Sequence, residues 1–284
     1  MGSTPTLEVP GYQVVQFLGS GARSTIWQIR DRQTGRLFAL KRVVKRQRSD
    51  ARFLEQATNE YRFASELDHP NVRHIYRLRK VNRWLSLREI HLVMELCDGL
   101  TVQENRPESV YEAVRIFTLV AQALAYINGR NIVHADMKPN NILVAPDGQV
   151  KIIDFGQSCR VGTIKERIQG TPDFIAPEQV RRLPLDGRTD VFNFGAALYW
   201  TLTGRPIPTV LPKTAGVTFK SDLAITPPEQ HNSDVPAPLS KLTIDCIDLN
   251  PARRPQTMSE VAGRLGLIAH TIKRKDPVSD QDVS

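Results

Sequence analysis

The stretch His134-Ala135-Asp136-Met137-Lys138-Pro139-Asn140-Asn141 decides the fold of this chain, together with Asp154-Phe155-Gly156, which begins thirteen residues after Asn141. It places two acids, a lysine and an asparagine close together in the sequence. Carboxylate and amide oxygens are the ligands that hard divalent cations prefer, and a carboxylate can also orient a hydroxyl group. These residue types at this spacing indicate a site that holds a metal-bound nucleotide and directs a hydroxyl towards a phosphate.

Composition is consistent with a globular chain that contains such a site. At 284 residues and 40% apolar composition, the chain can bury a large core, and one domain of two lobes fits its length. Its three cysteines, Cys97, Cys159 and Cys246, are odd in number and scattered, which favours a reducing compartment over a disulfide or metal framework. We find no apolar run of about 18 residues and no signal segment, so we expect a cytoplasmic protein without a membrane span.

The net charge of +8 is unevenly distributed along the chain. Residues 12–97 carry 17 Lys and Arg against 8 Asp and Glu, whereas residues 98–284 carry 21 of each. The basic excess concentrates in residues 41–52 and 73–88. An exposed basic face can dock an acidic protein, an anionic membrane or nucleic acid, or can simply be solvated. No nucleic-acid-binding motif accompanies the charge, which favours a solvated face; an acidic partner stays open and nucleic acid is not expected.

Hydrophobic periodicity predicts a small sheet in the first third of the chain. Alternating apolar residues on both sides of Gly19 and Gly21 predict a hairpin, and the next apolar run predicts a third strand. Helical spacing then begins and ends before Pro70, and two further strands follow. Asp98-Gly99 marks a hinge. The predicted elements are strands at 12–17, 26–29, 37–44, 72–78 and 90–96, and a helix at 53–67.

The remainder of the chain has helical periodicity. A strongly amphipathic helix is predicted over Val110–Asn128, directly before the Asp136 stretch. Residues 189–202 are almost wholly apolar around Asp190, which indicates a helix buried on all sides. Residues 206–238 are rich in proline and polar residues with little periodicity. Two closing helices are predicted at 238–249 and 258–273.

Glycines between the first two strands add a second candidate feature. Gly19-Ser20-Gly21-Ala22-Arg23-Ser24 can fold its backbone amides over phosphates, since glycine permits close approach. Ala39-Leu40-Lys41 follows on the next strand. Taken alone, a glycine pair is weak evidence and a lone lysine favours a surface role. Their spacing relative to each other, and to the Asp136 stretch, gives them weight.

These motifs together resemble the eukaryotic-like serine/threonine protein kinases. In that family a glycine-rich loop precedes a Val-Ala-Ile-Lys strand, and a His-Arg-Asp catalytic loop precedes Asp-Phe-Gly and Ala-Pro-Glu. Ala176-Pro177-Glu178 supplies the last of these motifs here. Lys138 and Thr171 favour the serine/threonine branch over the tyrosine kinases. The resemblance covers about residues 12–270 and implies an α+β, two-lobe fold: an extension at 1–11, an N-lobe with a small sheet and one main helix at 12–97, a mostly helical C-lobe at 98–270, and a disordered tail at 271–284.

The resemblance also implies roles for single residues. Asp136 would orient the hydroxyl of a protein serine or threonine, and Lys138 would neutralise charge on the transferred phosphoryl group. Asn141 and Asp154 would hold Mg²⁺. Lys41, paired with Glu60, would bind phosphates of ATP. Further nucleotide contacts are implied at Gly19, Ser20, Gly21, Ala22 and Ser24 over the phosphates, at Ile26, Ala39 and Leu143 around adenine, at Met94 behind the pocket, and at Glu95 and Cys97 through their backbone.

Two departures from the family pattern concern regulation. Ala135 stands where the family has an arginine that gathers an activation-loop phosphate. The usual phosphate acceptor, thirteen residues after Asp154, is Arg167, which cannot be phosphorylated. Because both halves of the switch are missing, we hypothesise that the loop is ordered without phosphorylation or by an acidic partner. Ser158, Thr163 and Thr171 remain as hydroxyls, and Thr171 is expected to contact Asp136 rather than to accept phosphate.

Two other departures leave alternatives open. Ser24 replaces the third glycine of the loop, and Ala64 replaces a large apolar residue that usually packs against the Phe of Asp-Phe-Gly. With Ala135, these could indicate a pseudokinase-like ATP-binding or scaffold module. A small-molecule kinase is a further alternative, although such enzymes generally lack the Ala-Pro-Glu segment. Here Glu178 is expected to form a buried ion pair with Arg254.

Overall fold

The structure, a computed structural model, describes residues 7–21, 23–83, 86–208 and 225–275. Its contacts divide the chain into two compact units, one of Met1–Asp98 with Asp154–Gly156 and the other of Gly99–Ile153 with Gln157–Ser284. The Asp-Phe-Gly segment therefore groups with the first unit. The expected phosphate contact at Ala22, the centre of the 206–238 stretch and the tail from residue 276 lie outside the described residues.

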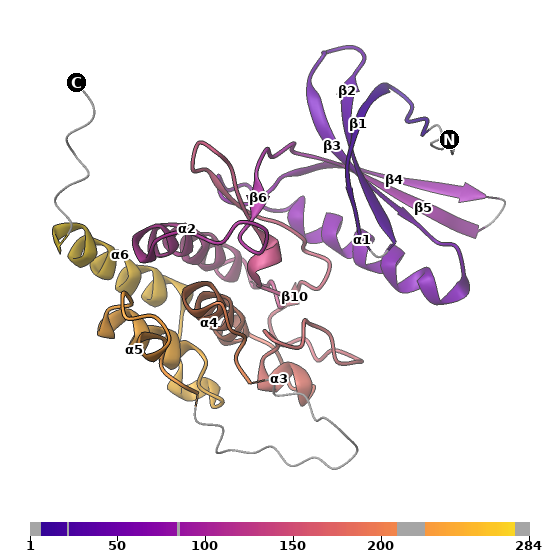
Figure 1. The fold of residues 1–284 in the computed structure, drawn as a ribbon. Coiled ribbons are helices and arrows are strands. Elements are labelled where there is room, and N and C mark those ends of the chain that lie inside the picture. Colours follow the sequence, from indigo (N-terminus) through magenta and orange to yellow (C-terminus); the bar gives the residue numbers. More distant parts are fainter. Residues whose placement is uncertain (1–6, 22, 84–85, 209–224, 276–284) are drawn as a thin grey trace, which may run out of the picture. The chain divides into compact units, whose positions relative to one another are not determined.

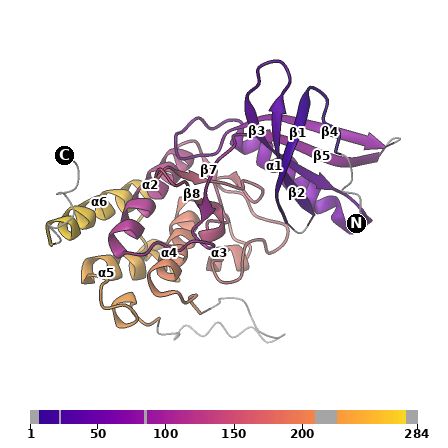
Figure 2. The ribbon, with the colours of Figure 1, turned by 45° about the horizontal axis from the view of Figure 1, so that its top comes forward.

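The first unit is a five-stranded antiparallel sheet with one long helix, as predicted (Figure 1). The strand order is β1-β2-β3-β5-β4. Figure 2 shows the same strands with α1 lying along the sheet. The elements are β1 Tyr12–Ser20, β2 Ser24–Asp31, β3 Leu37–Val44, a 3₁₀ turn Arg48–Asp50, α1 Ala51–Ala64, β4 Ile75–Arg83 and β5 Ser86–Met94.

Element ends differ from the predicted ones where local hydrogen bonds decide them. Helix α1 ends at Ala64 because the amides of Glu66 and Leu67 bond three residues back, to Phe63 and Ala64, which tightens the chain into turns. Strands β4 and β5 form a longer hairpin than their apolar pattern predicts, since their exposed ends are polar. Hydrophobic periodicity reports only the buried part of such a hairpin.

One face of the sheet packs against the amino-terminal segment. Leu40 lies opposite Trp27 on β2 and Val93 on β5, so their side chains share this face. Leu40 and Val93 form a buried cluster with Ile29 and Val9, and Leu7 packs against it. The described part of the expected extension at 1–11 therefore contributes to the core of the first unit.

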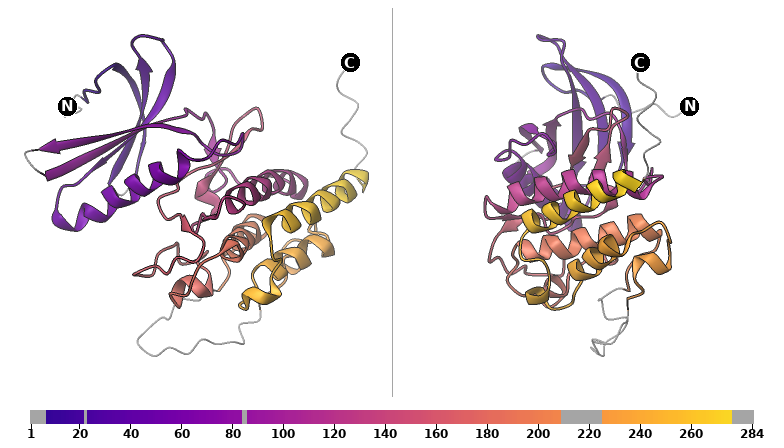
Figure 3. Two further views of the ribbon diagram at one scale, coloured as in Figure 1. Left: turned by 180° about the vertical axis from the view of Figure 1, so that it is seen from behind. Right: turned by 90° about the vertical axis from the view of Figure 1, so that its left-hand side faces the viewer.

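The second unit is mainly helical. Helix α2 packs against α6, and α4 packs against α5 and α2. Figure 3 shows α2, in magenta, and α6, in yellow, lying side by side. The elements are β6 Leu100–Thr101, α2 Val110–Asn128, β7 Ile132–Val133, β8 Ile142–Val144, β9 Val150–Ile152, β10 Cys159–Arg160, α3 Pro177–Val180, α4 Gly187–Thr203, α5 Ala237–Cys246 and α6 Met258–Lys275, with 3₁₀ turns at Pro139–Asn141, Pro228–Gln230 and Pro251–Arg253.

Helix ends in this unit follow their capping residues. The Ser109 hydroxyl accepts a bond from the amide of Glu112 at the start of α2, and Asp186 caps α4 in the same way. Gly204 ends α4 in the left-handed conformation, with φ of 71°. Helix α4 is buried along nearly its whole length, which confirms the predicted core helix.

Two sequence expectations need correction. Helix α6 continues to Lys275, so residues 271–275 are helical and do not belong to a disordered tail. Helix α2, of 19 residues, is long and apolar enough to cross a membrane by length and composition alone, although no such run was expected. Half of its apolar window is buried inside the structure, as in the core helix of a globular domain.

Candidate active site

The residues expected around the nucleotide share one face of the sheet in the first unit. Across the ladders, Ile26 lies opposite both Gly19 and Lys41. Ala39 lies two residues before Lys41 and opposite Met94. Residues directly opposite one another project to the same side. The sheet therefore gathers Gly19, Ile26, Ala39, Lys41 and Met94 on a single surface, with Ala39 and Met94 buried.

The glycine-containing hairpin closes tightly between β1 and β2. The amide of Gly21 donates to the carbonyl of Ser24 at 2.9 Å. A Cβ at Gly21 would lie 3.0 Å from the Ser24 hydroxyl, whereas one at Gly19 would meet nothing within 4 Å. Ser20 is exposed at the hairpin end. Arg23 ties this end to the 3₁₀ turn before α1, because its Nε donates to Asp50 at 2.8 Å.

The chain leaves the sheet after Met94 through a segment that is hydrogen-bonded to the residue before strand β4. The Glu95 amide donates to the carbonyl of His74 at 2.9 Å, and the Glu95 carboxylate accepts from the His74 amide at 3.1 Å. The thiol of Cys97 lies 3.8 Å from the Glu95 carbonyl. The bond from the Glu95 amide to His74 holds the backbone at Glu95, one of the two positions expected beside adenine.

Lys41 and Glu60 form the expected ion pair. The Lys41 Nζ lies 2.6 Å from Glu60 Oε2, and Glu60 is only 1% exposed. Arg73 approaches the other carboxylate oxygen at 3.9 Å. Burial would lower the pKa of Lys41, but the charges of Glu60 and Asp154 outweigh it and the pKa is raised. Lys41 is therefore held as a cation on the face of the sheet that carries the other residues expected around the nucleotide.

Asp154 is held in a left-handed backbone conformation, with φ of 66°. Its Oδ1 accepts a bond from the amide of Gly156 at 3.2 Å, and Asn59 of α1 donates to the carbonyl of Gly156 at 3.1 Å. Ala64 and Phe155 are both fully buried. Asn59, which was not among the expected site residues, anchors the Asp-Phe-Gly backbone to the helix that carries Glu60.

In the second unit, Asp136, Lys138 and Thr171 form a closed set of hydrogen bonds. The Lys138 Nζ lies 2.9 Å from Asp136 Oδ2 and 2.8 Å from the Thr171 hydroxyl. That hydroxyl donates to Asp136 Oδ1 at 3.1 Å. The predicted contact between Thr171 and Asp136 is confirmed. A carboxylate and an ammonium group are thus held together, which can orient an incoming hydroxyl and stabilise negative charge.

The backbone before Asp136 is hydrogen-bonded to a buried acid of α4. Asp190 accepts bonds from the amides of His134 at 2.9 Å and Ala135 at 2.8 Å, and from the Asn128 side chain at 2.8 Å. Burial raises the pKa of Asp190, and these donors oppose that shift. Ala135 adopts a left-handed conformation, with φ of 59°, which costs about 1–2 kcal/mol for a residue with a Cβ. Asp190 stabilises this strained turn.

Asn141 is oriented by the same loop. Its Nδ2 donates to the Asp136 carbonyl at 2.8 Å, which turns the amide oxygen to the other side. Asn141 belongs to the second unit, as does Leu143, which is 9% exposed on β8. Asp154 belongs to the first. Among the described residues no three His, Cys, Asp or Glu form a metal cluster. Asn141 and Asp154 each carry an oxygen ligand of the kind that Mg²⁺ prefers, and proteins usually bind Mg²⁺ through one or two carboxylates together with substrate phosphates.

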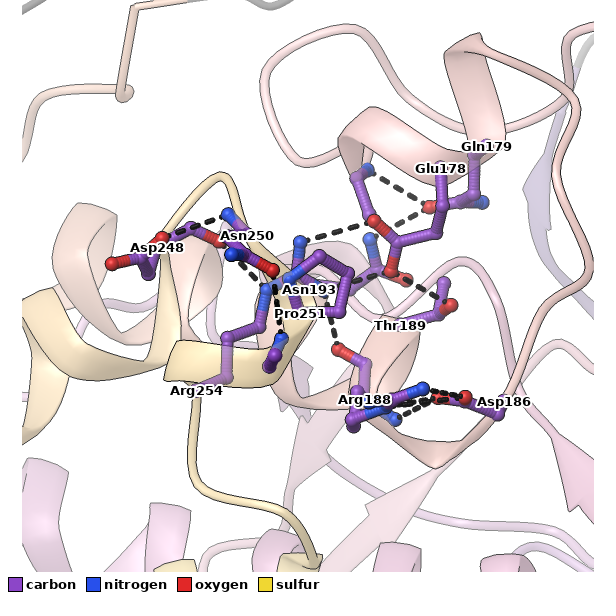
Figure 4. A network of polar contacts seen from close by, with 12 residues as sticks. Glu178, Gln179, Asp186, Arg188, Thr189, Asn193, Asp248, Asn250, Pro251 and Arg254 are labelled. Carbon is purple, nitrogen blue, oxygen red and sulfur yellow. Dashed lines mark hydrogen bonds and ion pairs between the residues drawn. The ribbon is translucent and has the colours of Figure 1, made fainter.

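The predicted ion pair of Glu178 and Arg254 is confirmed (Figure 4). Two guanidinium nitrogens approach the two carboxylate oxygens at 2.7 and 3.0 Å. The Thr189 hydroxyl donates to the same carboxylate at 2.9 Å, and Arg254 also donates to the carbonyl of Arg188 at 2.8 Å. Both charges are buried and fully bonded. The pair joins the end of the Ala-Pro-Glu segment to helix α4 and to the turn before α6.

Sequence comparison matches residues 12–264 to the family described as "Protein kinase domain". A probable serine/threonine-protein kinase of Corynebacterium efficiens is 31% identical over 91% of this chain and 41% of its own length. The serine/threonine-protein kinase PrkC of Bacillus subtilis is 28% identical over 88% and 39%, and PknB of Mycolicibacterium smegmatis is 28% identical over 93% and 44%. The chain spans about two fifths of the length of these relatives. With the motif residues placed as described, the chain belongs to the protein kinase domain family.

Proposed function

We propose that the protein is a serine/threonine kinase that transfers the γ-phosphate of ATP to hydroxyls of protein substrates. The observation that carries this proposal is the hydrogen-bonded set of Asp136, Lys138 and Thr171. Asp136 would accept the hydrogen bond of the substrate hydroxyl and orient it for attack. Lys138 would stabilise charge that develops on the transferred phosphoryl group. Thr171 would hold these two side chains at a fixed separation.

The nucleotide and metal roles rest on the remaining motif residues. Lys41, oriented by Glu60, would bind phosphate oxygens, and the glycine-containing hairpin would supply backbone amides. Asn141 and Asp154 would hold Mg²⁺, which supplies neutralisation of phosphate charge when bound. Ile26, Ala39, Met94 and Leu143 would form apolar walls around adenine.

A pseudokinase-like scaffold is the second candidate, favoured by Ala135, Ser24 and Ala64. Kinase-like proteins that have lost activity have usually lost one or more of the essential polar residues. Here Lys41 is paired with its buried acid, and Asp136 is bonded to Lys138. A small-molecule kinase is disfavoured by the confirmed pair of Glu178 and Arg254. Both observations support the active protein kinase.

Labelled ATP, magnesium and a generic basic protein substrate test the proposal. The Asp136→Asn variant should lose about 10²–10⁴-fold in rate, because hydroxyl orientation and proton acceptance are lost while the size of the side chain is kept. Asp234→Asn is a matched control, since Asp234 is an exposed acid of the same unit. A wild-type protein that binds ATP but transfers no phosphate, or an Asp136→Asn variant with the wild-type rate, would favour the scaffold.

We further propose an acidic protein partner for the basic first unit. Within residues 41–52 and 73–88, the side chains of Arg46, Arg48 and Arg79 are exposed. Lys45 and Arg62 line a hollow of about 420 Å³ beside α1, together with the apolar Ala51, Leu54 and Leu87 and the polar Glu55, Thr58 and Asn59. An acidic segment with an apolar anchor would complement this hollow. Binding of such a peptide should weaken at high salt and in a Lys45→Glu/Arg62→Glu variant; binding unchanged by both would contradict the proposal.

The three cysteines are free thiols. Cys159 and Cys246 are buried, and burial raises the pKa of the Cys246 thiol to about 12. Such thiols are unreactive and fit a reducing compartment. We therefore propose a cytoplasmic location for this kinase domain.

A further inference from the structure

The position of Ala135 carries no phosphate-binding side chain. Ala135 is 1% exposed and belongs to a buried apolar cluster with Val133, Cys159 and Leu185. Arg167, at the usual acceptor position, is exposed. The structure nevertheless holds Thr171, near the end of the activation segment, within hydrogen-bond distance of Asp136. Some other group must bring these two stretches of backbone together.

Gln179, the residue after Glu178, supplies that group (Figure 4). It is 3% exposed, and its side-chain amide makes four hydrogen bonds. Its Nε2 donates to the carbonyl of Ala135 at 2.8 Å and to that of Gln169 at 3.2 Å. Its Oε1 accepts from the amide of Ala176 at 2.9 Å and from Asn193 of α4 at 2.9 Å.

The two carbonyls bound by Gln179 lie next to the reacting groups in sequence. Ala135 immediately precedes Asp136, and Gln169 lies two residues before Thr171. One amide nitrogen therefore sets the separation between the catalytic loop and the end of the activation segment. Asn193 holds the oxygen of the Gln179 side-chain amide in place. Its Nδ2 donates to this oxygen and also to the carbonyl of Phe174 at 2.6 Å.

Other side chains hold the rest of the activation segment without a phosphate. The Lys165 Nζ donates to the carbonyl of Gln157 at 2.7 Å, and Arg182 donates to the carbonyl of Lys165 at 3.2 Å. The hydroxyls of the segment are already engaged. Ser158 is 1% exposed, and Thr163 donates to the carbonyl of Arg160 at 2.6 Å.

We infer that Gln179 is a positioning residue that orders the activation segment of the unphosphorylated enzyme, in the place of a phosphate bound by an arginine. This inference rests on the proposed kinase activity. Gln179 touches neither substrate nor nucleotide. It acts through the backbone of Ala135 and Gln169 and so on the geometry of Asp136 and Thr171.

The variant Gln179→Glu tests this role, because it keeps the size of the side chain and replaces the donating nitrogen by an oxygen. That oxygen would face two carbonyl oxygens in a buried place. Burial and the facing carbonyls favour the neutral carboxyl, which can still donate one bond. Phosphoryl transfer to peptide should fall about 10–100-fold at pH 8.5, and the ratio to wild type should recover towards pH 6. ATP affinity, measured by thermal shift, should stay unchanged.

Two further variants separate positioning from folding. Gln179→Met removes the donor without adding a charge, so it should lose the same rate at every pH. Gln149→Glu adds the same charge at an exposed position of the same unit and should behave as wild type. Rates equal to wild type for both Gln179→Glu and Gln179→Met at all pH values would overturn the inference. So would failure of both Gln179 variants to fold, since Gln179 would then support the fold rather than position the loop. A wild-type protein without transferase activity would instead refute the proposed function.

Discussion

The side chains of Asp136, Lys138 and Thr171 are hydrogen-bonded to one another, so the position of each depends on the other two. Lys138 bonds both the carboxylate and the Thr171 hydroxyl, and Thr171 in turn bonds the carboxylate. In the proposed kinase reaction, this arrangement would orient the substrate hydroxyl for attack. Well-oriented reacting groups can contribute several kcal/mol to a rate, so a small displacement of one member has a measurable effect.

Replacing Thr171 tests this dependence. Thr171→Val keeps the shape and removes both hydrogen bonds of the hydroxyl, so Asp136 and Lys138 lose their fixed separation. We expect kcat for a peptide substrate to fall about 10–100-fold with little change in ATP affinity, whereas Thr171→Ser should keep most of the rate. Steady-state kinetics with peptide and ATP varied separately would measure this. Equal activity of the valine and serine variants would contradict the assigned contact.

Lys41 and Glu60 allow a double-mutant cycle that separates stability from activity. Lys41→Met leaves Glu60 buried without its partner, which should cost about 3–5 kcal/mol in the free energy of unfolding. Adding Glu60→Gln removes the unpaired charge, so the double variant should regain most of that stability and none of the activity. Denaturant unfolding and ATP binding would be measured on all four proteins. A double variant no more stable than Lys41→Met would show that the pair does not carry this energy.

At the scale of elements, an ion pair between Arg42 and Glu89 joins strands β3 and β5. Arg42 donates two bonds to Glu89, each of 2.7 Å, across the ladder in which Arg42 lies opposite His91. The Arg42 hydrogen bonds lower the pKa of Glu89 from 4.5 to about 2, although burial opposes them. Burial lowers the pKa of His91, so this neighbour is neutral at pH 7.

This pair predicts a pH dependence of stability. Because the pKa of Glu89 is lowered on folding, its stabilisation is present above pH 4.5 and is lost as the pH falls towards 2. Glu89→Gln should therefore lower the free energy of unfolding at pH 7 by about 1 kcal/mol, allowing for solvent screening, and should have little effect near pH 2. Unfolding curves of both proteins across this range would check it. An equal difference at pH 7 and pH 2 would show that charge is not the cause.

The elements also show what the sequence could predict. Val110–Asn128 and Leu37–Val44 match their predicted bounds, because strong apolar periodicity and clear capping or turn residues mark them. The ion pairs of Lys41 and of Arg254 were expected from the resemblance to the protein kinases. Gln179 and Asn59 were not, since each binds backbone carbonyls far away in sequence. A glutamine or asparagine in a helix gives no local sign of such a partner.

At the scale of the whole molecule, two compact units differ in charge and in architecture. The first is a basic sheet with one helix, and the second is mainly helical and carries a smaller net charge. Lys41, Glu60 and Asp154 belong to the first unit, and Asp136 and Asn141 to the second. In the second unit the polar contacts of Gln179 and Lys165 are complete without a phosphate. We therefore propose that the kinase is active without phosphate on its activation segment.

The most direct measurement is the initial rate of phosphoryl transfer by protein whose unphosphorylated state is verified by mass spectrometry. The protein would be co-expressed with a phosphatase, freed of it, and mixed with peptide, ATP and magnesium. We predict full activity from the first time point, with no lag and no dependence on phosphate at Ser158, Thr163 or Thr171. A dephosphorylated protein that is inactive, or that gains activity only as phosphate accumulates on its activation segment, would contradict the account.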